Sequence, residues 1–587
     1  MTQSRTHNCN ELRMSDVGSQ VTLVGWYENM RKVSKNLGFL VLRDFYGTTQ
    51  IVVETEDMME IIDSVNKEST ISVTGTVRER SSKNAELATG EIEVVPSEIK
   101  ILGKCVHNEL PFEINRSKDA DENTRLKYRY LDLRNKEVKD KIVLRSKIVA
   151  ELRAAMIAHD FLEITTPILT CSSPEGARDY LVPARNHPGK FYALPQAPQQ
   201  FKQILMASGF DRYFQIAPCF RDEDARADRS PGEFYQLDME MSFASQEDVF
   251  AVVEDVLPPI FAKYGVYKSA SQAPFVRIPY LEAMDKYGSD KPDLRIDLVL
   301  QDATEVMADC GFGPFEGNVV KAIVVDNLTA TRKQIDAMIA EVEVATAQKT
   351  YWFKLDENGE IVGGIAKFLQ ERKQAVIDAL SLKPGDFVGL AAGNLLIAQK
   401  TAGVFRKLLG AAAEGHMTKD VYEFCWIVDF PMYEIGEESG ELEFCHNPFS
   451  MPQGGMDALK SRNPLDILAY QYDLVCNGVE LSSGAIRNHD PEIMIEAFKL
   501  VGLGEDDVKA KFPAMYNAFT YGAPPHGGIA PGVDRMIMLI AGEESIREII
   551  PFPMNKNAQD IMMDAPATVE QKQLDDVHIA IVMPEED

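Results

Sequence analysis

The first 108 residues alternate between short apolar runs and turn-forming segments. The runs lie at positions 21–26, 38–42, 49–53, 71–75 and 92–95. Successive side chains of a β-strand point to opposite sides, so an alternation with period two is typical of strands with one buried face. Five or so short strands over this length predict a small β-barrel.

In residues 142–160 the apolar side chains recur at a longer spacing, which predicts an amphipathic helix. Its apolar stripe recurs at every fourth position and consists of Leu144, Ile148, Leu152 and Met156. The helix is followed by a predicted strand at residues 161–169 that contains Pro167. Proline cannot donate to a β-ladder, so this strand is expected at an edge or a bulge.

The whole pattern predicts an α+β protein in which an OB-fold is the barrel that fits best. Residues 291–415 have strand candidates at 322–325 and 351–354 and several helices, which indicates a separate α+β insertion. The predicted segments are an OB-fold barrel at 1–108, a basic hinge at 109–140, a larger domain in two parts at 141–290 and 416–570, the insertion domain at 291–415 and a C-terminal tail at 571–587.

Composition indicates an ordinary globular protein of three or four domains, because 45% of the 587 residues are hydrophobic and 26% are charged. No apolar run approaches the ~18 residues that a membrane crossing needs, and the first residues lack the apolar core of a secretory signal. The eight cysteines occur singly, which argues against a zinc site or a disulfide scaffold. We therefore expect a cytoplasmic protein that does not insert into membranes.

The net charge of −29 argues, taken alone, against nucleic-acid binding. Residues 116–147 differ, because they carry eleven basic and six acidic side chains. Two interpretations of this segment remain open: a seat for a phosphate backbone, or a solvated helix face with ordinary ion pairs.

The most informative chemistry lies in residues 219–243, which predict a strand, a long charged loop and a second strand. In the second strand Phe234, Gln236 and Asp238 share one face, which offers a ring, an amide and a carboxylate. Arg221, where the first strand ends, adds a planar five-donor cation suited to phosphate. Together these groups could stack a purine, bind a phosphate and capture an ammonium group.

This segment resembles motif 2 of the class II aminoacyl-tRNA synthetases, and specifically of the bacterial-type aspartyl-tRNA synthetases. The helix and strand of residues 142–169 resemble motif 1, which builds the dimer interface in that family. The resemblance covers nearly the whole chain. It implies a catalytic domain built on an antiparallel sheet, a homodimer formed through motif 1, and an OB-fold that binds the anticodon.

Residues 527–542 resemble motif 3, in which small residues precede Arg535 and an apolar run predicts a buried helix. Arg535 would lie near the helix start, where the dipole favours phosphate. In the family this arginine packs on adenine, and Phe234 on the other face would complete a sandwich worth up to about 2 kcal/mol. The resemblance assigns ATP binding to Arg221, Asp222, Glu223, Ser230, Phe234, Glu480, Gly532, Val533, Asp534 and Arg535, and catalysis to Arg221, Glu223 and Arg535.

Asp473 and Glu480 supply two carboxylates seven positions apart. Magnesium usually takes one or two carboxylates plus substrate phosphates, although acidic pairs at such spacing are more often simply solvated. In the family the matching residues hold the metal that bridges the ATP phosphates. The resemblance therefore implies ATP as substrate and Mg²⁺ as cofactor.

Arg487 is assigned by the resemblance to the side-chain carboxylate of the amino-acid substrate, with help from Lys202. A guanidinium can bind a carboxylate bidentately, which an ammonium cannot. Two cations would select aspartate over asparagine, since the isosteric amide would leave buried cations without a counter-charge.

Residues 172–181 resemble the family's mobile loop, in which Glu175 closes over the substrate amino group. His446 matches a histidine that responds to the aspartate pocket, although a lone histidine is more often a structural hydrogen-bonding residue. The full aspartate-binding set implied by the resemblance is Glu175, Gln196, Gln199, Lys202, Arg221, Asp238, His446 and Arg487.

Arg31, Phe39 and Gln50 fall on or beside the barrel strands and are the predicted anticodon contacts. Aromatic rings on an OB-fold surface stack bases at about 1–3 kcal/mol each, and amides and guanidiniums read base edges. The alternative for Phe39 is that it belongs to the barrel core.

The family's activity would be ATP-dependent activation of L-aspartate to an adenylate, followed by transfer to the 3′ end of tRNA-Asp. Whether tRNA-Asn is also charged is left open. Two alternatives are a sister ligase for asparagine, which the charges of Arg487 and Lys202 disfavour, and a non-catalytic RNA-binding relative. Such relatives typically lose the ATP-binding arginines or the metal carboxylates, which this chain retains.

Overall fold

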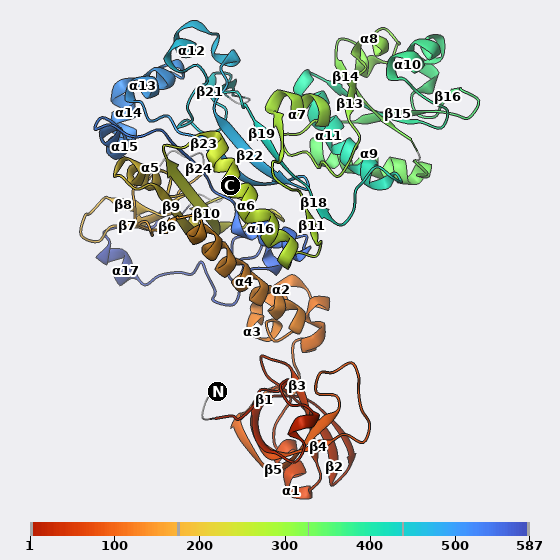
Figure 1. Cartoon of the computed structure of the whole chain (residues 1–587), viewed down its shortest axis with the longest axis vertical. Coiled ribbons are helices and arrows are strands. Elements are labelled where there is room, and N and C mark those ends of the chain that lie inside the picture. Colours follow the sequence, from red (N-terminus) through yellow and green to blue (C-terminus); the bar gives the residue numbers. More distant parts are fainter. Residues whose placement is uncertain (1–3, 173–176, 327, 437–438, 584–587) are drawn as a thin grey trace. The chain divides into compact units, whose positions relative to one another are not determined.

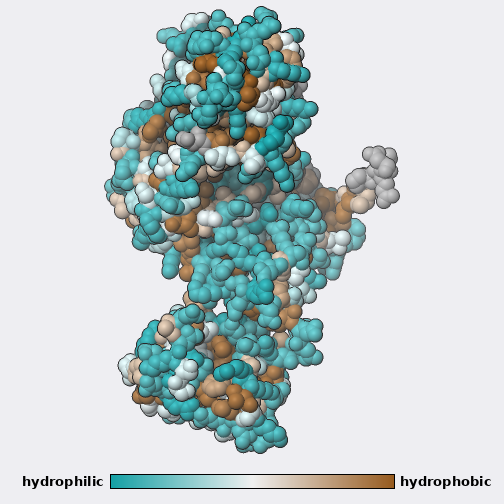
Figure 2. Space-filling model, turned by 90° about the vertical axis from the view of Figure 1, so that its right-hand side faces the viewer, coloured by the Kyte–Doolittle hydropathy of each residue, from teal (hydrophilic) through white to brown (hydrophobic). Residues whose placement is uncertain are grey.

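The computed structural model describes residues 4–172, 177–326, 328–436 and 439–583. The chain forms two compact units, Met1–Ser117 and Lys118–Asp587 (Figure 1). None of the helices in these ranges has the length and apolar character that a membrane crossing requires. On the face shown in Figure 2 hydrophilic residues predominate, and hydrophobic residues form smaller groups.

The first unit is a closed five-stranded barrel, which confirms the predicted OB-fold. The strands follow the order β1-β2-β3-β5-β4 around the barrel. Alternating apolar side chains such as Leu23, Leu40 and Ile51 fill its interior. All five predicted runs lie within its strands, and the unit consists of β1 (Gln20–Ser34), β2 (Leu37–Arg43), β3 (Thr48–Val53), α1 (Glu56–Asp63), β4 (Thr70–Glu79) and β5 (Ile92–Gly103).

The second unit is centred on an eight-stranded sheet with the order β12-β19-β22-β23-β24-β10-β9-β6. Only the outermost pairs, β12 with β19 and β6 with β9, are parallel. The sheet is therefore mainly antiparallel, as the resemblance implied. Its strands are β6 (Leu162–Glu163), β9 (Arg212–Arg221), β10 (Gly232–Ser242), β12 (Val276–Pro279), β19 (Phe424–Val428), β22 (Gln471–Cys476), β23 (Val479–Ile486) and β24 (His526–Ile529).

Helices pack on this sheet and around its edges. The side chains of α6 and α16 join those of the central strands in one large core that includes Phe250, Trp426 and Ile537. The helices are α5 (Gln199–Ala207), α6 (Gln246–Tyr264), α12 (Gly455–Ser461), α13 (Pro491–Leu500), α14 (Glu505–Lys511), α15 (Pro513–Phe519), α16 (Val533–Ala541) and, in the C-terminal segment, α17 (Gln571–Asp576).

The predicted amphipathic helix is α4 (Lys136–Ala158), which starts earlier than expected. The Asn135 side chain accepts a hydrogen bond from the Glu137 amide and caps the helix. Ile148, Leu152 and Met156 are buried, as the stripe predicted. The strand expected at residues 161–169 is only β6, because the backbone leaves the ladder before Pro167, which has no amide proton to donate.

The insertion contains a separate five-stranded sheet with the order β13-β14-β17-β15-β16. Both predicted strand candidates lie within it. Helix α7 (Tyr280–Tyr287) precedes the insertion. The elements of the insertion are β13 (Leu300–Asp302), α8 (Thr304–Met307), β14 (Val319–Val325), α9 (Arg332–Thr346), β15 (Thr350–Leu355), β16 (Ile361–Val362), α10 (Lys373–Leu380), β17 (Phe387–Gly393) and α11 (Leu395–Ala412).

The basic segment at residues 116–147 is largely engaged in contacts within the second unit. Arg125 pairs with Glu548, and Arg129 donates to the carbonyl oxygens of Ile550 and Pro551. Arg145 pairs with the buried Asp534. For these arginines the structure favours a structural role over a free phosphate-binding surface, because their guanidinium groups are already paired.

Candidate active site

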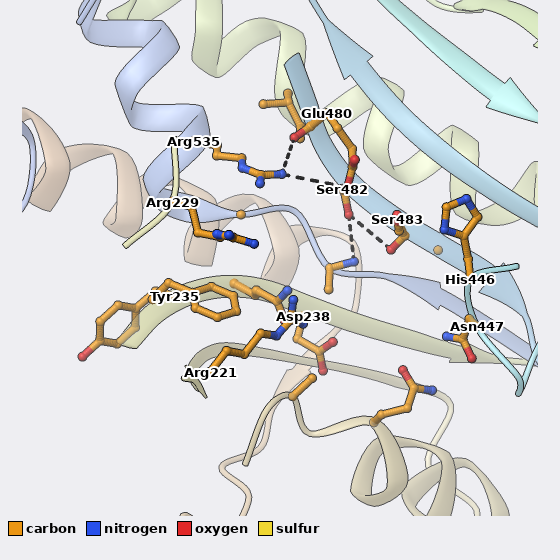
Figure 3. Close-up of a pocket in the computed structure, with 18 of the residues that line it drawn as sticks. Arg221, Arg229, Tyr235, Asp238, His446, Asn447, Glu480, Ser482, Ser483 and Arg535 are labelled. Carbon is orange, nitrogen blue, oxygen red and sulfur yellow. Dashed lines mark hydrogen bonds and ion pairs between the residues drawn. The ribbon is translucent and has the colours of Figure 1, made fainter. Parts of the chain in front are cut away.

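A cavity of about 310 Å³ collects side chains from distant parts of the chain. In Figure 3 Arg221 and Asp238 lie on one side of it, and Glu480, Ser482, Ser483 and Arg535 lie on the other. The predicted site residues that line it are Gln199, Lys202, Arg221, Glu223, Ser230, Phe234, Asp238, His446, Glu480, Arg487, Gly532, Asp534 and Arg535.

The hairpin of β9 and β10 positions the first group of these side chains. Arg221 lies opposite Gly232, so both the arginine and the start of β10 lie at the same end of the hairpin. The Arg221 guanidinium lies 5.0 Å from the ring centroid of Phe234. Its Nε is buried and has no hydrogen-bond partner among the described residues. This donor is therefore available to a bound anion.

Arg535 lies in the first turn of α16 and points toward β23 (Figure 3). Its Nη1 donates to the main-chain oxygen of Glu480 at 2.9 Å, and Nη2 lies 3.4 Å from a carboxylate oxygen of Asp228. In this structure Arg221 therefore lies over Phe234, while Arg535 contacts the acidic side of the cavity. The predicted base sandwich between Phe234 and Arg535 stays a prediction.

Two residues next to Arg535 have structural contacts. Asp534 accepts a hydrogen bond from the Tyr235 amide at 3.1 Å and pairs with Arg145, so it ties α16 to β10 and α4. Val533 is buried in the core and does not line the cavity. These contacts favour a structural role for both residues beside the cavity.

The two acidic residues predicted to bind a metal lie close together on β22 and β23. Asp473 is opposite Ser483, whose hydroxyl donates to it at 2.6 Å. Burial, and then repulsion from Glu480, raises the pKa of Asp473 well above its usual range. Burial opposes ionisation of Glu480 as well, but Lys291 and Arg535 lower its pKa.

This donor set fits magnesium. Two carboxylates and a hydroxyl are hard oxygen ligands, and a divalent cation would relieve the repulsion between two buried carboxylates. Asp473 itself does not line the cavity and lies behind Ser483. Within the described ranges no cluster of three histidine, cysteine or acidic side chains has metal-binding geometry, so the remaining ligands would come from substrate and water.

A buried network of four charges, Lys202, Asp238, Glu240 and Arg487, borders the cavity. Lys202 Nζ lies 2.6 Å from Asp238 and 3.3 Å from Glu240. Arg487 donates to both oxygens of Glu240, from Nε at 2.8 Å and from Nη2 at 3.1 Å. Each of these four side chains is at most 2% exposed.

This network corrects the charge argument made from the sequence. Arg487 and Lys202 were expected to form a doubly cationic pocket, but Asp238 and Glu240 already compensate them. Burial raises the pKa of Asp238, although Lys202 acts in the opposite direction. Asp238 Oδ2 is buried and has no hydrogen-bond partner within the part of the chain described, so it is an acceptor in place for a ligand donor.

Two residues at the site, Glu240 and Lys291, were not predicted from the sequence. A signal for Glu240 existed, because the alternation that groups Phe234, Gln236 and Asp238 on one face of β10 continues to position 240. Lys291 gives no comparable signal, since it lies in the loop after α7 and reaches Glu480 only through the tertiary fold. Its Nζ lies 2.6 Å from Glu480 Oε2.

The remaining predicted residues occupy different surroundings. Gln196 lies outside the main cavity, where its amide holds Ala177 and Asp179 at the base of the loop at 172–181. Asp222 is exposed beside Arg178 and does not line the cavity. Burial lowers the pKa of His446, which lines the cavity and packs edge-on against Phe430. Glu175 lies outside the described residues.

The predicted anticodon residues lie together on the outer surface of the barrel. Arg31 is opposite Phe39, and its guanidinium lies 4.8 Å from the ring centroid. Gln50, on the neighbouring strand β3, donates to Glu93 at 2.9 Å. Phe39 is only half-buried whereas the flanking Leu40 is fully buried, so the structure does not place Phe39 in the barrel core.

Two family models match the chain. A model of class II tRNA synthetases (D, K and N) covers residues 121–556, and a model of OB-fold nucleic-acid-binding domains covers residues 21–102. Among solved structures, an aspartyl-tRNA synthetase from Entamoeba histolytica has a TM-score of 0.55 at 19% identity, covering 92% of this chain and 89% of that one. An asparaginyl-tRNA synthetase from Pyrococcus horikoshii has a TM-score of 0.58 at 16% identity, and the match covers 94% of this chain and 98% of that one. At these identities the likeness concerns the fold.

Similar curated proteins extend over the full length. A protein of Streptomyces coelicolor named aspartate–tRNA ligase is 51% identical, and the alignment covers 100% of both chains. A protein of Zymomonas mobilis named aspartate–tRNA(Asp/Asn) ligase is 53% identical over 99% of this chain and 98% of its own. The chain therefore belongs to the class II tRNA synthetases of the group designated D, K and N.

Proposed function

We propose that this protein is an aspartate–tRNA ligase that uses ATP. The observation that carries the proposal is that a single cavity joins Arg487 and Asp238 to Arg221, Arg535 and Glu480. A carboxylate-binding arginine beside a polyphosphate-binding set is what activation of an acidic amino acid requires. The full-length relatives named aspartate–tRNA ligases support the same substrate.

Aspartate would be oriented by the buried charge network. Arg487 uses Nε and Nη2 for Glu240, so Nη1 is the donor expected to meet the side-chain carboxylate. The ammonium group would donate to Asp238 Oδ2, the buried acceptor. Asparagine would turn an amide N–H toward a guanidinium that only donates, so one hydrogen bond would be lost and two donors would face each other.

The proposed reaction needs no protein nucleophile. The α-carboxylate oxygen of aspartate attacks the α-phosphorus of ATP, and the bond to pyrophosphate breaks. The ribose hydroxyl at the tRNA 3′ end then attacks the carbonyl carbon of the adenylate, and AMP leaves. Arg221 would stabilise the charge that develops on the α-phosphate, and reactant positioning would supply the rest. Magnesium, held by Asp473 and Glu480, would neutralise polyphosphate charge.

The direct test is aspartate-dependent exchange of labelled pyrophosphate into ATP without tRNA, with asparagine and lysine as controls. Exchange with aspartate alone is expected. Exchange with asparagine would identify the sister ligase instead. No exchange with any amino acid, in folded protein with magnesium, would favour the non-catalytic RNA-binding relative.

Replacing Asp473 with asparagine is expected to raise the Mg²⁺ concentration needed for half-maximal ATP binding by about tenfold, because one of two hard anionic ligands is lost. Calorimetric titration of ATP at a series of Mg²⁺ concentrations measures this shift. Asp466→Asn, in the short helix before β22, is the matched control. An unchanged Mg²⁺ requirement in the Asp473 variant would count against the metal assignment.

We also propose that the outer face of the barrel binds the anticodon through Arg31, Phe39 and Gln50. Phe39→Ala is expected to weaken tRNA binding by roughly 5- to 100-fold, the loss of one stacked base. Fluorescence anisotropy with labelled tRNA-Asp measures the affinity, and pyrophosphate exchange without tRNA should stay unchanged. Val17→Ala, which alters an exposed apolar side chain of the barrel unit, is the control. Equal affinity in wild type and Phe39→Ala would contradict the stacking role.

Exposed apolar side chains near motif 1 support the proposed homodimer. They lie after α4 and on the hairpin of β7 (Leu181–Pro183) and β8 (Phe191–Ala193), and they are Leu162, Ile168, Leu169, Leu181, Phe191 and Tyr192. A second copy of the chain is the occupant that the resemblance to motif 1 indicates. Sedimentation analysis, with Ile168→Asp as the disrupting variant, measures the state of assembly.

A second candidate activity is charging of tRNA-Asn. Relatives of similar identity carry either the name aspartate–tRNA ligase or aspartate–tRNA(Asp/Asn) ligase. These names support charging of tRNA-Asp alone as well as charging of both tRNAs. Aminoacylation of purified tRNA-Asp and tRNA-Asn measures directly which tRNAs are charged.

The eight cysteines are free thiols, in keeping with the proposed cytoplasmic location.

A further inference from the structure

Lys291 lines a second cavity and places a cation against Glu480, which lines the first cavity, and no family motif contributes this lysine. Its ammonium group lies 2.6 Å from Glu480 Oε2. Arg535 lies near the other oxygen of the same carboxylate, with 3.9 Å between Nη1 and Oε1. The Glu480 carboxylate thus lies between two cations, Lys291 and Arg535.

The backbone that carries Lys291 is fixed by helix α11 of the insertion. Arg406, which is buried, donates to the main-chain oxygens of Asp293, Ile296 and Leu298. Gly288, at the end of α7, has a left-handed backbone, and a Cβ there would lie 2.2 Å from the carbonyl oxygen of Gln399. The loop at 288–298 is therefore pressed against α11 at one end and bonded to it at the other.

The Lys291 side chain is less constrained than its backbone. It is 42% exposed, and the same loop lines a second cavity of about 460 Å³, which shares His446 with the first. Its ammonium group can therefore exchange one partner for another without movement of the loop.

We propose that Lys291 contacts the pyrophosphate portion of the nucleotide, as the β- and γ-phosphates of ATP before reaction and as the leaving group afterwards. In the absence of nucleotide the same ammonium group holds Glu480 in place. The inference rests on the proposed function, because it takes ATP as the substrate of this cavity. The lysine stays protonated throughout, so it adds charge neutralisation and no proton transfer.

Lys291 lies beside the carboxylate that would help to hold a phosphate-bound magnesium ion. Its ammonium group contacts Glu480 at 2.6 Å, so it would lie close to phosphates bound at this carboxylate. If Glu480 held the metal, Lys291 would lose this partner, and the phosphates would offer its ammonium group another anion. A long, flexible ammonium group is suited to following a departing anion.

The test compares Lys291→Gln, which removes the contact with Glu480, with Lys407→Gln, another lysine that lines the second cavity. Calorimetry with pyrophosphate and Mg²⁺, and separately with AMP, gives the affinities. Lys291→Gln is expected to weaken pyrophosphate binding about tenfold, the equivalent of one charged hydrogen bond, and to leave AMP binding unchanged. Lys407→Gln is expected to bind both as wild type does.

A second readout separates this role from a structural one. Binding of Mn²⁺ without nucleotide, followed by electron paramagnetic resonance, is expected to strengthen in Lys291→Gln, because the competing ammonium group is gone. Unchanged pyrophosphate affinity would overturn the inference, as would equal weakening of pyrophosphate and AMP or an unchanged Mn²⁺ affinity. Failure of wild-type protein to exchange pyrophosphate with aspartate would instead overturn the proposed function.

Discussion

Arg221→Ala is expected to lower the rate of aspartyl-adenylate formation by about 10³-fold or more. The guanidinium lies at the end of β9, beside Phe234, with a buried Nε that has no partner in the described structure. Removing one preorganised donor from a site of developing charge costs about 10²–10³ in rate, and a cation on a transferring phosphoryl group contributes about 10³–10⁵.

Single-turnover rapid-quench measurement of aspartyl-adenylate reports this rate directly. Arg226→Ala, in the loop that follows β9 and outside the cavity, is the matched control and should react as wild type does. Thermal unfolding of both variants checks that the fold is retained. Near-normal adenylate formation by Arg221→Ala would remove Arg221 from its assigned role.

The second large effect is expected from Arg487→Lys, which should raise the KM for aspartate at least 100-fold while the KM for ATP changes little. A lysine cannot donate to both oxygens of Glu240 and to a ligand carboxylate in the same plane. The variant would leave Glu240 underbonded, and a buried carboxylate that loses its partner costs about 3–5 kcal/mol.

Steady-state pyrophosphate exchange at varied aspartate and at varied ATP separates the two effects. Arg462→Lys, an exposed arginine, serves as the control for the chemical change itself. Equal loss toward both substrates, or a loss of folding seen by circular dichroism, would mean that Arg487 supports the domain rather than the substrate.

Local patterns predicted the parts of this molecule that depend on local chemistry. The alternation in the first 108 residues predicted the barrel, and the period of four predicted α4, because burial of one face imposes these periods. The β9–β10 hairpin could be predicted for the same reason, since Arg221, Phe234 and Asp238 belong to adjacent strands with one continuous register.

The ion pairs that the sequence did not predict join residues from distant segments. Lys202 and Glu240 are neighbours only because α5 packs on the sheet, and their charges cancel at 3.3 Å. Lys291 meets Glu480 across 189 positions, through a loop that α11 holds. Similarly, the excess of basic residues at 116–147 could not be divided into paired and free charges until Arg125, Arg129 and Arg145 had found their partners.

The compensated network of Lys202, Asp238, Glu240 and Arg487 also bears on how amino-acid preference can evolve. Any single replacement that changes the charge of one member leaves an uncompensated buried ion, so most one-step routes to a new preference pass through an unstable protein. A change of preference therefore requires paired replacements, one on the substrate-facing residue and one on its counter-ion. Libraries that randomise positions 240 and 487 together should yield folded variants that single-site libraries miss, and lineages should carry these two positions as a linked pair.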